Sequence, residues 1–334
     1  MTTNTKVTLA ARPNGMPTLD DFKVVEEQLG ELPPEHVLVK VDTLSVDAFI
    51  RTMLDDRDSF HGVTPIGGPV VALGVGQVME SNSDQLAVGD WVNGPMMAQS
   101  HAQLPAAMLQ KISPADNIPP RTYLGVLGLT TGITAWVGMS VVGEVKAEQT
   151  VVVSGAAGAV GSVAAQVAKA RGARVIGIAG GPEKGAYLVS TLGLDASIDY
   201  KKGNVRDDLK ELAPNGVDLF FDNVGGDILD DVLDNLAEGG TVVLCGAVSQ
   251  YQNMTDVQGP KLYLRIAERN ASMKGFTVSY YPETHAQAAQ ELSEWLMDGQ
   301  VKLPEHEIKG VDNFPQALIT LLSGGHMGKM VVVP

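Results

Sequence analysis

The sequence is poor in cysteine and in positive charge. Its 334 residues include one cysteine, Cys245, which excludes a disulfide within the chain and a structural zinc site built from several thiolates. Lys and Arg number 24 against 39 Asp and Glu, so the formal net charge is −15. A chain this acidic is not expected to bind nucleic acid or an anionic membrane, and an anionic cofactor would need a local basic pocket.

Long apolar runs and clustered metal ligands are also missing. No uninterrupted apolar run has the length of a membrane span, and residues 1–9 are polar and lack the apolar core of a signal peptide. These absences predict a cytoplasmic protein. The histidines form no spaced Cys/His/Glu cluster of the kind that catalytic zinc needs, so no metal site is expected. They are His36, His61, His101, His285, His306 and His326. No Gly-X-Ser-X-Gly nucleophile motif is present.

The sequence does contain a glycine-rich turn between an apolar run and a helical stretch. The run Val151–Val153 is β-branched and predicts a buried parallel strand. Glycines 155, 158 and 161 follow, and residues 162–170 are expected to form a helix that ends near Gly172. The N–H groups and positive dipole end of such a helix can hold a pyrophosphate. The alternative is a tight turn without a ligand, but a further strand at 174–179 favours dinucleotide binding.

From residue 149 onward, strand and helix patterns alternate. About six strands with helical crossovers predict an α/β fold with a doubly wound parallel Rossmann sheet. The strand candidates are Val151–Val153, Val175–Ile178, Ala196–Ile198, Leu219–Asp222, Val242–Cys245 and Ser272–Phe276.

Residues 6–94 have mostly β patterns instead. A final strand, Lys329–Val333, lies far from the nucleotide fold in sequence, so we expect it to return to this β domain and make it discontinuous. We therefore predict one domain from residues 1–124 and 300–334, and a dinucleotide-binding domain from residues 125–299. The apolar segment 124–139 is rich in glycine, for which either close helix packing or the approach of a substrate is an explanation.

The end of the second strand bears on which dinucleotide is bound. NAD sites usually have an acid there, about 20 residues after the glycine turn, whereas this sequence has Ala179-Gly180-Gly181. Lys184 and Tyr200 follow and suit a ribose 2′-phosphate, which predicts NADP. The alternative is that the lysine belongs to a solvated surface, as most lysines do. In so acidic a chain, a basic group at this place favours the phosphate.

Polar residues also follow the fourth and fifth strands, whose carboxyl ends face the ligand crevice. Asn223 has amide groups suited to ribose or nicotinamide, although an Asx turn before the next helix also explains it. Tyr251 closes the run Cys245–Tyr251. Its phenol, with an ordinary pKa of about 10, is a feasible proton donor.

Motifs along nearly the whole chain match one family in the right order. They are residues 12–17, 156–161, 183–184, 200–201, 221–226, 245–251 and 328–329. With these motifs the chain resembles the zinc-independent branch of the medium-chain dehydrogenase/reductase superfamily. Within that branch it is most similar to the prostaglandin reductase and curcumin reductase group of NADPH-dependent alkenal/one reductases.

The resemblance implies a chaperonin-10-like β domain closed by the C-terminal tail, NADPH or NADP+ as cofactor, and a homodimer. It places Phe49 and Arg51 on the substrate side. The sequence departs from the family's pattern at two places. Phe49 replaces a tyrosine in the family's motif at residues 45–51, and in the C-terminal tail His326 stands near the position of the usual asparagine. The implied cofactor-binding residues are Gly158, Ala159, Val160 and Gly161 at the pyrophosphate, Lys184 and Tyr200 at the 2′-phosphate, and Asn223, Cys245, Gly246, Ser249, Tyr251, Phe276, Thr277, Val278 and His326 elsewhere along the cofactor.

Together these features predict an NADPH-dependent reductase of the C=C bond of small α,β-unsaturated ketones or aldehydes. Hydride would go to the β-carbon, and Tyr251, as the catalytic residue, would stabilise the enolate oxygen. The alternatives are a quinone oxidoreductase on the same fold and a non-catalytic NADPH-binding protein. A methyltransferase is less consistent with the sequence, because Lys184 and Tyr200 would have no phosphate to bind.

Overall fold

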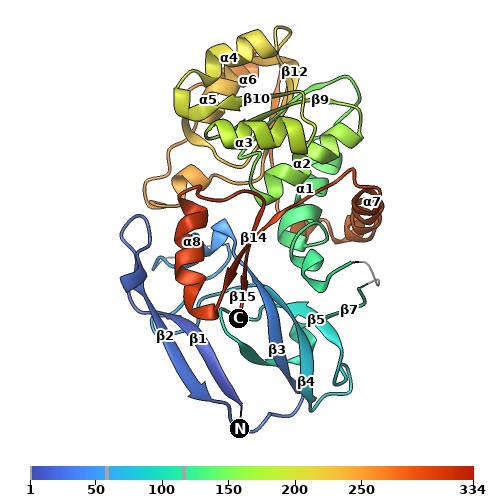
Figure 1. Cartoon of the computed structure of the whole chain (residues 1–334). Helices are drawn as coiled ribbons and strands as arrows, with labels where there is room; N and C mark the ends of the chain where they lie inside the picture. The colour runs from blue at the N-terminus through green and yellow to red at the C-terminus, as the bar shows by residue number, and fades with distance from the viewer. Residues whose placement is uncertain (1, 57–59, 115–117) are drawn as a thin grey trace. The chain divides into compact units, whose positions relative to one another are not determined.

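The computed structural model describes residues 2–56, 60–114 and 118–334 (Figure 1). The chain separates into two compact units, Met1–Leu124 with Glu305–Pro334, and Gly125–Pro304. The second unit ends at Pro304, whereas the dinucleotide-binding domain was expected to end at residue 299. Gln166 explains the difference, because its amide donates to the Lys302 carbonyl at 2.8 Å and accepts from the Lys302 N–H at 2.8 Å. These bonds attach the chain near residue 302 to the second unit.

The second unit is built on a six-stranded sheet in which every pair of neighbours is parallel, with the order β10-β9-β8-β11-β12-β13. The order reverses between β8 and β11, and ligands of such sheets bind at the carboxyl ends of strands beside this reversal. The expected doubly wound fold is therefore confirmed. The strands are β8 Thr150–Ser154, β9 Arg174–Ala179, β10 Ala196–Asp199, β11 Val217–Asp222, β12 Leu236–Leu244 and β13 Ser272–Gly275.

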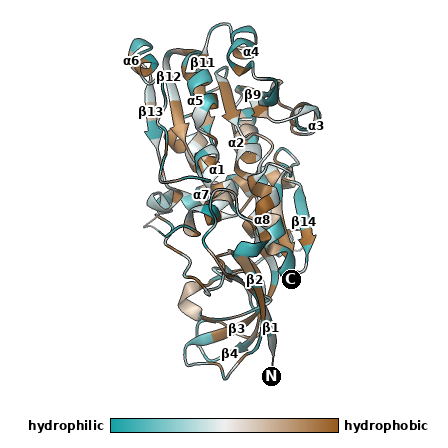
Figure 2. Ribbon diagram, turned by 90° about the vertical axis from the view of Figure 1, so that its left-hand side faces the viewer, coloured by the Kyte–Doolittle hydropathy of each residue, from teal (hydrophilic) through white to brown (hydrophobic). Residues whose placement is uncertain are grey.

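Both faces of this sheet are buried, which explains the continuous apolar runs of its strands. Val151 and Val153 of β8 lie in one core cluster with Val163, whereas Val152 lies in another with Leu209. Figure 2 accordingly shows β11 and β12 mostly in the brown of hydrophobic residues. The helices of this unit, apart from the α1 segment, are α2 Ala159–Ala170, α3 Pro182–Ala186, α4 Val205–Leu212, α5 Gly226–Leu233, α6 Leu264–Glu268 and α7 His285–Met297.

The glycine-rich segment that opens the second unit forms short helical turns, η5 Leu129–Ile133, α1 Thr134–Trp136 and η6 Val137–Val142. A side chain at Gly132 would place its Cβ 1.7 Å from the Val126 carbonyl oxygen. At Gly138 the Cβ would lie 2.6 Å from the rings of both Phe221 and Phe276. Close packing therefore accounts for the glycines at these two positions.

The first unit contains a two-stranded sheet, β1-β2, and a seven-stranded sheet of order β14-β15-β3-β4-β5-β7 in which β6 also pairs with β3. The C-terminal strand β15 runs antiparallel to β3 and parallel to β14, so its predicted return to the β domain is confirmed (Figure 1). The elements are β1 Thr3–Leu9, β2 Phe22–Gln28, β3 His36–Ser45, β4 Gly74–Ser81, β5 Trp91–Gly94, β6 His101–Pro105, β7 Gln110–Ile112, β14 Glu305–Lys309, α8 Phe314–Leu322 and β15 Lys329–Val333.

The core of this unit lies on one face of β3. Val37, Val39 and Val41 alternate along the strand and all join one buried cluster, which also contains Met330 and Val332 of β15. Alternation with a period of two therefore indicates the buried face correctly. Across the described ranges, no helix is both long and apolar enough to cross a membrane.

Candidate active site

The glycine turn links β8 to α2 at the carboxyl edge of the parallel sheet. Gly155 has φ of +59°, and Gly158 is the N-cap residue of α2. The helix begins at Ala159, earlier than the expected start at Ser162, because the Gly158 carbonyl already accepts the Ser162 N–H at 2.9 Å. A Cβ on Gly161 would lie 2.3 Å from the Gly155 carbonyl oxygen, so only glycine lets the turn and helix approach this closely. The first N–H groups of α2 have no acceptor within the helix and are suited to an anion.

The end of β9 brings together the residues expected at a ribose phosphate. Strand β10 pairs with β9 so that Asp199 lies opposite Ala179, which places Tyr200 beside this strand end. Tyr200 is 43% exposed, whereas Lys184 on α3 is half-buried. Burial, followed by the charge of Lys201, lowers the pKa of the Lys184 ammonium group. The Asp199 carboxylate accepts the N–H groups of Gly181 and Lys201 at 2.7 and 3.1 Å.

The end of β11 is organised by a buried acid that the sequence analysis did not single out. Asp222 accepts hydrogen bonds from Ser154 Oγ at 2.7 Å and from the N–H groups of Val224 and Gly225 at 3.0 Å. Burial raises the pKa of this carboxyl. The Asx-type turn therefore depends on Asp222 and not on Asn223. The Asn223 amide instead donates to the Ser154 carbonyl at 2.7 Å.

The Cys245–Tyr251 segment follows β12 and packs against the turn after β11. The N–H groups of Cys245 and Gly246 donate to the Asp222 carbonyl at 2.9 and 3.1 Å, and Ser249 Oγ donates to the Val224 carbonyl at 2.6 Å. Burial raises the pKa of the Cys245 thiol to about 12, so it stays protonated at neutral pH. Ser249 and the backbone of Cys245 and Gly246 thus fix the position of the turn that carries Tyr251.

The Tyr251 hydroxyl lies over the backbone of its own turn. It accepts the Ala247 N–H at 3.4 Å. A Cβ on Gly246 would approach the hydroxyl to 3.0 Å, so the glycine leaves room for it. Burial raises the pKa of this phenol, which keeps it protonated. Because the backbone bond uses the oxygen as an acceptor, the hydroxyl proton remains for a ligand.

Residues 276–278 follow β13, and their first side chain faces the core. The Phe276 ring makes edge contacts with Phe221 and Tyr281, at centroid distances of 6.4 and 6.5 Å. The Val278 carbonyl bonds to His285 Nε2 at 3.0 Å. Thr277 and Val278 are half-buried. Any contact of Phe276 with a cofactor therefore falls to its backbone, because its ring is used in packing.

The substrate-side candidates belong to the first unit, on the 3-10 helix η2, Ala48–Met53. Arg51 is 1% exposed, and its guanidinium donates to the Gly15 carbonyl at 3.0 Å and pairs with Asp55 at 2.6 Å. This burial gives Arg51 a structural role, and its predicted contact with substrate gains no support from the geometry. Phe49 is half-buried, with its ring centroid 4.7 Å from that of His61.

A buried ion pair in the first unit was not foreseen. Lys329 Nζ lies 2.6 Å from Asp47 Oδ1, and Ser45 Oγ donates to the other carboxylate oxygen. Asp47 is the N-cap residue of η2, so the pair links the C-terminal strand to the helix of Phe49. In the sequence, the only indication of this ion pair was the tail motif Gly328-Lys329. His326, half-buried, precedes this strand.

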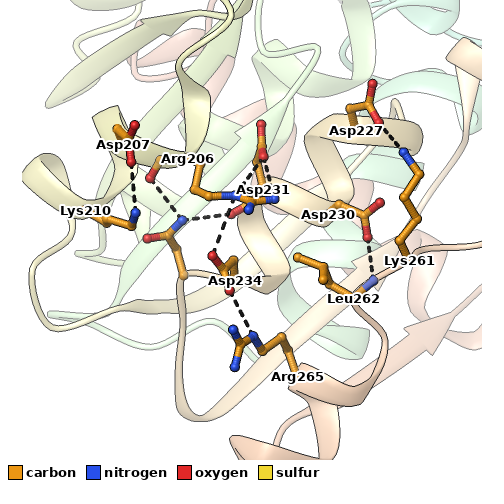
Figure 3. Close-up of polar contacts among 11 residues, drawn as sticks. Arg206, Asp207, Lys210, Asp227, Asp230, Asp231, Asp234, Lys261, Leu262 and Arg265 are labelled. Atoms are coloured by element: carbon orange, nitrogen blue, oxygen red, sulfur yellow. Dashed lines mark hydrogen bonds and ion pairs between the residues drawn. The ribbon is translucent and has the colours of Figure 1, made fainter.

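Acidic residues of α5, together with its C-cap residue Asp234, hold the chain that follows the Tyr251 turn (Figure 3). Asp230, which is 6% exposed, accepts the Leu262 N–H at 2.8 Å. Asp234 pairs with Arg265 at 2.9 Å, and the exposed Asp227 pairs with Lys261 at 3.0 Å. The segment from Lys261 to Arg265 is thus attached along one side of α5.

We expect Asp230→Ala to lower the free energy of unfolding by about 1–2 kcal/mol, because it removes a nearly buried charged acceptor from the Leu262 N–H. Asp227→Ala is the matched control from the same helix, and its exposed pair should leave stability unchanged. Urea unfolding followed by circular dichroism measures both. Equal changes in the two variants would contradict the assigned importance of burial.

Metal ligands are not clustered in the part of the chain that the structure describes. There, no group of three or more His, Cys, Asp or Glu side chains is arranged to hold a metal ion.

Comparisons with known proteins extend these observations. A family model described as the N-terminal domain of oxidoreductase matches residues 5–112, and one described as zinc-binding dehydrogenase matches residues 159–294. The NADPH-dependent curcumin reductase of Escherichia coli (strain K12) is 32% identical over 98% of this chain and 96% of its own. Prostaglandin reductase 1 of Bos taurus is 33% identical over 95% of each chain.

A solved structure resembles the whole chain. The crystal structure of CurA from Vibrio vulnificus in complex with NADPH has a TM-score of 0.92 and 34% sequence identity, and the match covers 98% of each chain. The chain therefore belongs to the medium-chain dehydrogenase/reductase superfamily, in the group of the curcumin and prostaglandin reductases.

Proposed function

We propose that this NADP-dependent oxidoreductase reduces the C=C bond of α,β-unsaturated ketones and aldehydes. The observation that carries the proposal is the protonated Tyr251 hydroxyl, held over Gly246 and Ala247 at the carboxyl end of β12. That place lies next to β11, which borders the reversal of strand order where dinucleotide folds bind their ligand. The NADPH-dependent curcumin reductase among the relatives supports the same reaction class.

The residues of the second unit fit NADPH. The turn at Gly155–Gly161 is tight, because a Cβ on Gly161 would lie 2.3 Å from the Gly155 carbonyl oxygen, and the first N–H groups of α2 suit the pyrophosphate. Lys184 and Tyr200 supply a cation and a hydroxyl donor for the 2′-phosphate. Gly180 and Gly181 stand where an acid would repel that phosphate.

The protein's own part in the reaction is to orient and to stabilise charge. Bound NADPH would supply the hydride that adds to the β-carbon of the alkene, and a proton taken up from solvent would complete the reduction at the α-carbon. Tyr251 then donates a hydrogen bond to the carbonyl oxygen as negative charge develops there. The Ala247 N–H orients the phenol oxygen, and the bond from Ser249 to the Val224 carbonyl fixes the turn that carries it. The burial that raises the pKa of Tyr251 keeps its proton available.

We infer that the reaction needs no zinc. The span matched by the zinc-binding dehydrogenase model, residues 159–294, contains one cysteine and one histidine, Cys245 and His285. The His285 ring is bonded to the Val278 carbonyl, and Cys245 keeps its proton, so neither is prepared as a metal ligand. A homodimer and a cytoplasmic location remain predictions.

The proposal is tested by NADPH oxidation with three substrates matched in size, an enone, its saturated ketone and a quinone. We expect turnover with the enone alone, and mass spectrometry should show a product that gains two hydrogens and retains its carbonyl group. Activity should survive dialysis against a chelator. Turnover of the quinone alone would favour the quinone oxidoreductase. Tight NADPH binding without turnover of any enone would favour a non-catalytic protein.

A further inference from the structure

We propose that Lys201 is a third ligand of the cofactor's 2′-phosphate, beside Lys184 and Tyr200, and that Gly180 provides the space for it. The inference rests on the proposed use of NADPH and adds a specificity-determining residue to that site. The motif around Tyr200 contains two further lysines, Lys201 and Lys202, which the sequence alone does not distinguish.

The space beside Gly180 distinguishes them. A Cβ built on Gly180 would lie 2.8 Å from Tyr200 Cε1, 3.1 Å from Tyr200 Cζ and 2.9 Å from Lys201 Cε. Cζ carries the tyrosine hydroxyl, and Cε carries the lysine ammonium group. Both functional groups therefore emerge directly beside Gly180, at the carboxyl end of β9, where a dinucleotide fold places the adenosine ribose.

A hydrogen-bonded turn holds Lys201 in this position. The Asp199 carboxylate caps the 3-10 helix η8, Tyr200–Lys202, by accepting the Lys201 N–H, and it accepts the Gly181 N–H as well. These bonds join the ends of β9 and β10. They also lower the pKa of Asp199, first through Gly181, so the carboxylate stays ionised and engaged with the backbone. Asp199 is thus a positioning residue, and the Lys201 side chain is directed to Gly180.

The charges around Lys201 are arranged for an anion. The Lys201 ammonium group is close enough to lower the pKa of Lys184, although burial contributes more. Within the described residues, no carboxylate forms an ion pair with Lys201. A phosphate dianion between the two ammonium groups would convert their mutual repulsion into two attractions. Lys202 is equally charged and exposed and belongs to the same short helix, but the three atoms nearest to a Cβ on Gly180 belong to Tyr200 and Lys201.

Binding of adenosine 2′,5′-bisphosphate, measured by calorimetry on the intact protein, tests this assignment, with 5′-AMP as the probe that lacks the 2′-phosphate. Lys201→Ala should lower the affinity for the bisphosphate about five- to tenfold. This loss lies between that expected for an exposed ion pair and that expected for a hydrogen bond to a charged group. Lys202→Ala, the matched control, should leave it unchanged. Gly180→Ala should weaken it at least as much as Lys201→Ala, because the methyl group displaces both Tyr200 and Lys201. None of the three should alter 5′-AMP binding.

The outcomes separate this inference from the proposed function. If Lys184→Ala weakens the bisphosphate while Lys201→Ala behaves like Lys202→Ala, Lys201 is a surface lysine and the inference is overturned, but the cofactor assignment stands. If the wild type binds the bisphosphate no more tightly than 5′-AMP, the assignment of Lys184 and Tyr200 to a phosphate fails as well. A loss of 5′-AMP binding in Gly180→Ala would mean that the methyl group damages the whole adenosine site, and the role given to Gly180 would be wrong.

Discussion

Replacing Tyr251 by phenylalanine should lower kcat for an enone by about ten- to a thousandfold, as the loss of a donor to a developing oxyanion does. The substitution removes one oxygen and keeps the ring, so the turn at Gly246 and Ala247 should persist. NADPH affinity should change much less than kcat, because the donated bond strengthens only as charge develops. Steady-state kinetics together with fluorescence titration of NADPH measure the two effects separately.

Tyr263→Phe is the matched control for this experiment. Tyr263 belongs to the same unit, and its side chain is 59% exposed. The substitution removes the same hydroxyl group from a tyrosine to which no role in the reaction is assigned. The pH dependence adds a second readout. A donor must be protonated, so the rate falls only above the pKa of Tyr251, which burial raises beyond its ordinary value of about 10. No basic limb from this group should therefore be seen below about pH 10. An unchanged kcat in Tyr251→Phe would reduce Tyr251 to a packing residue.

Lys329→Met should lower the free energy of unfolding by about 3–5 kcal/mol. Lys329 is 1% exposed and Asp47 is 8% exposed, and their ion pair spans 2.6 Å. Methionine keeps most of the length of the lysine side chain but leaves the Asp47 carboxylate buried, and among the described residues the Ser45 hydroxyl is then the one side chain that still donates to it. Denaturant unfolding gives the change in stability.

Lys6→Met is the control that separates burial from geometry. Lys6 pairs with Glu27 in the same unit at the same distance, 2.6 Å, but these side chains are 22% and 38% exposed. Its loss should cost less than about 1 kcal/mol. Removing both buried charges, in Lys329→Met with Asp47→Leu, should recover part of the stability lost by Lys329→Met alone. Similar losses for Lys6→Met and Lys329→Met would show that burial does not decide the strength of these pairs.

The sequence was sufficient for the elements whose pattern is local. Strand β8 was predicted from three consecutive β-branched residues, and the turn after it from its glycines. The return of Lys329–Val333 to the β domain was also predicted correctly. The start of α2 was placed too late, at Ser162, because small residues have no side-chain pattern that marks where a turn ends and a helix begins. Hydrogen bonding by the Gly158 carbonyl decides this boundary.

The site was predictable by residue type but not by contact. Lys184 and Tyr200 are assigned to the 2′-phosphate because a cation and a hydroxyl at the end of β9 suit a phosphate, and this assignment stays a prediction. Asp222 was not predicted, because its role depends on the Ser154, Val224 and Gly225 groups that donate hydrogen bonds to it in the folded chain. The partnership of Asp47 and Lys329 joins residues 282 positions apart, and no local pattern contains it. The inward orientation of the Phe276 ring likewise depends on the space that Gly138 leaves open.

The position of β15 between β14 and β3 has a consequence for how the chain folds as it is synthesised. Residues 125–304 are contiguous and can complete their own sheet as soon as they leave the ribosome. The first unit has to wait, because the strand that pairs with Leu44 and Ser45 of β3, and the buried ammonium group that Asp47 needs, are made after residues 125–304. Until then Leu44 and Ser45 of β3 lack the partner strand that β15 provides, although β6 already pairs with His36–Lys40, so the sheet of the first unit stays incomplete. The part of the chain made first is therefore the part that finishes folding last.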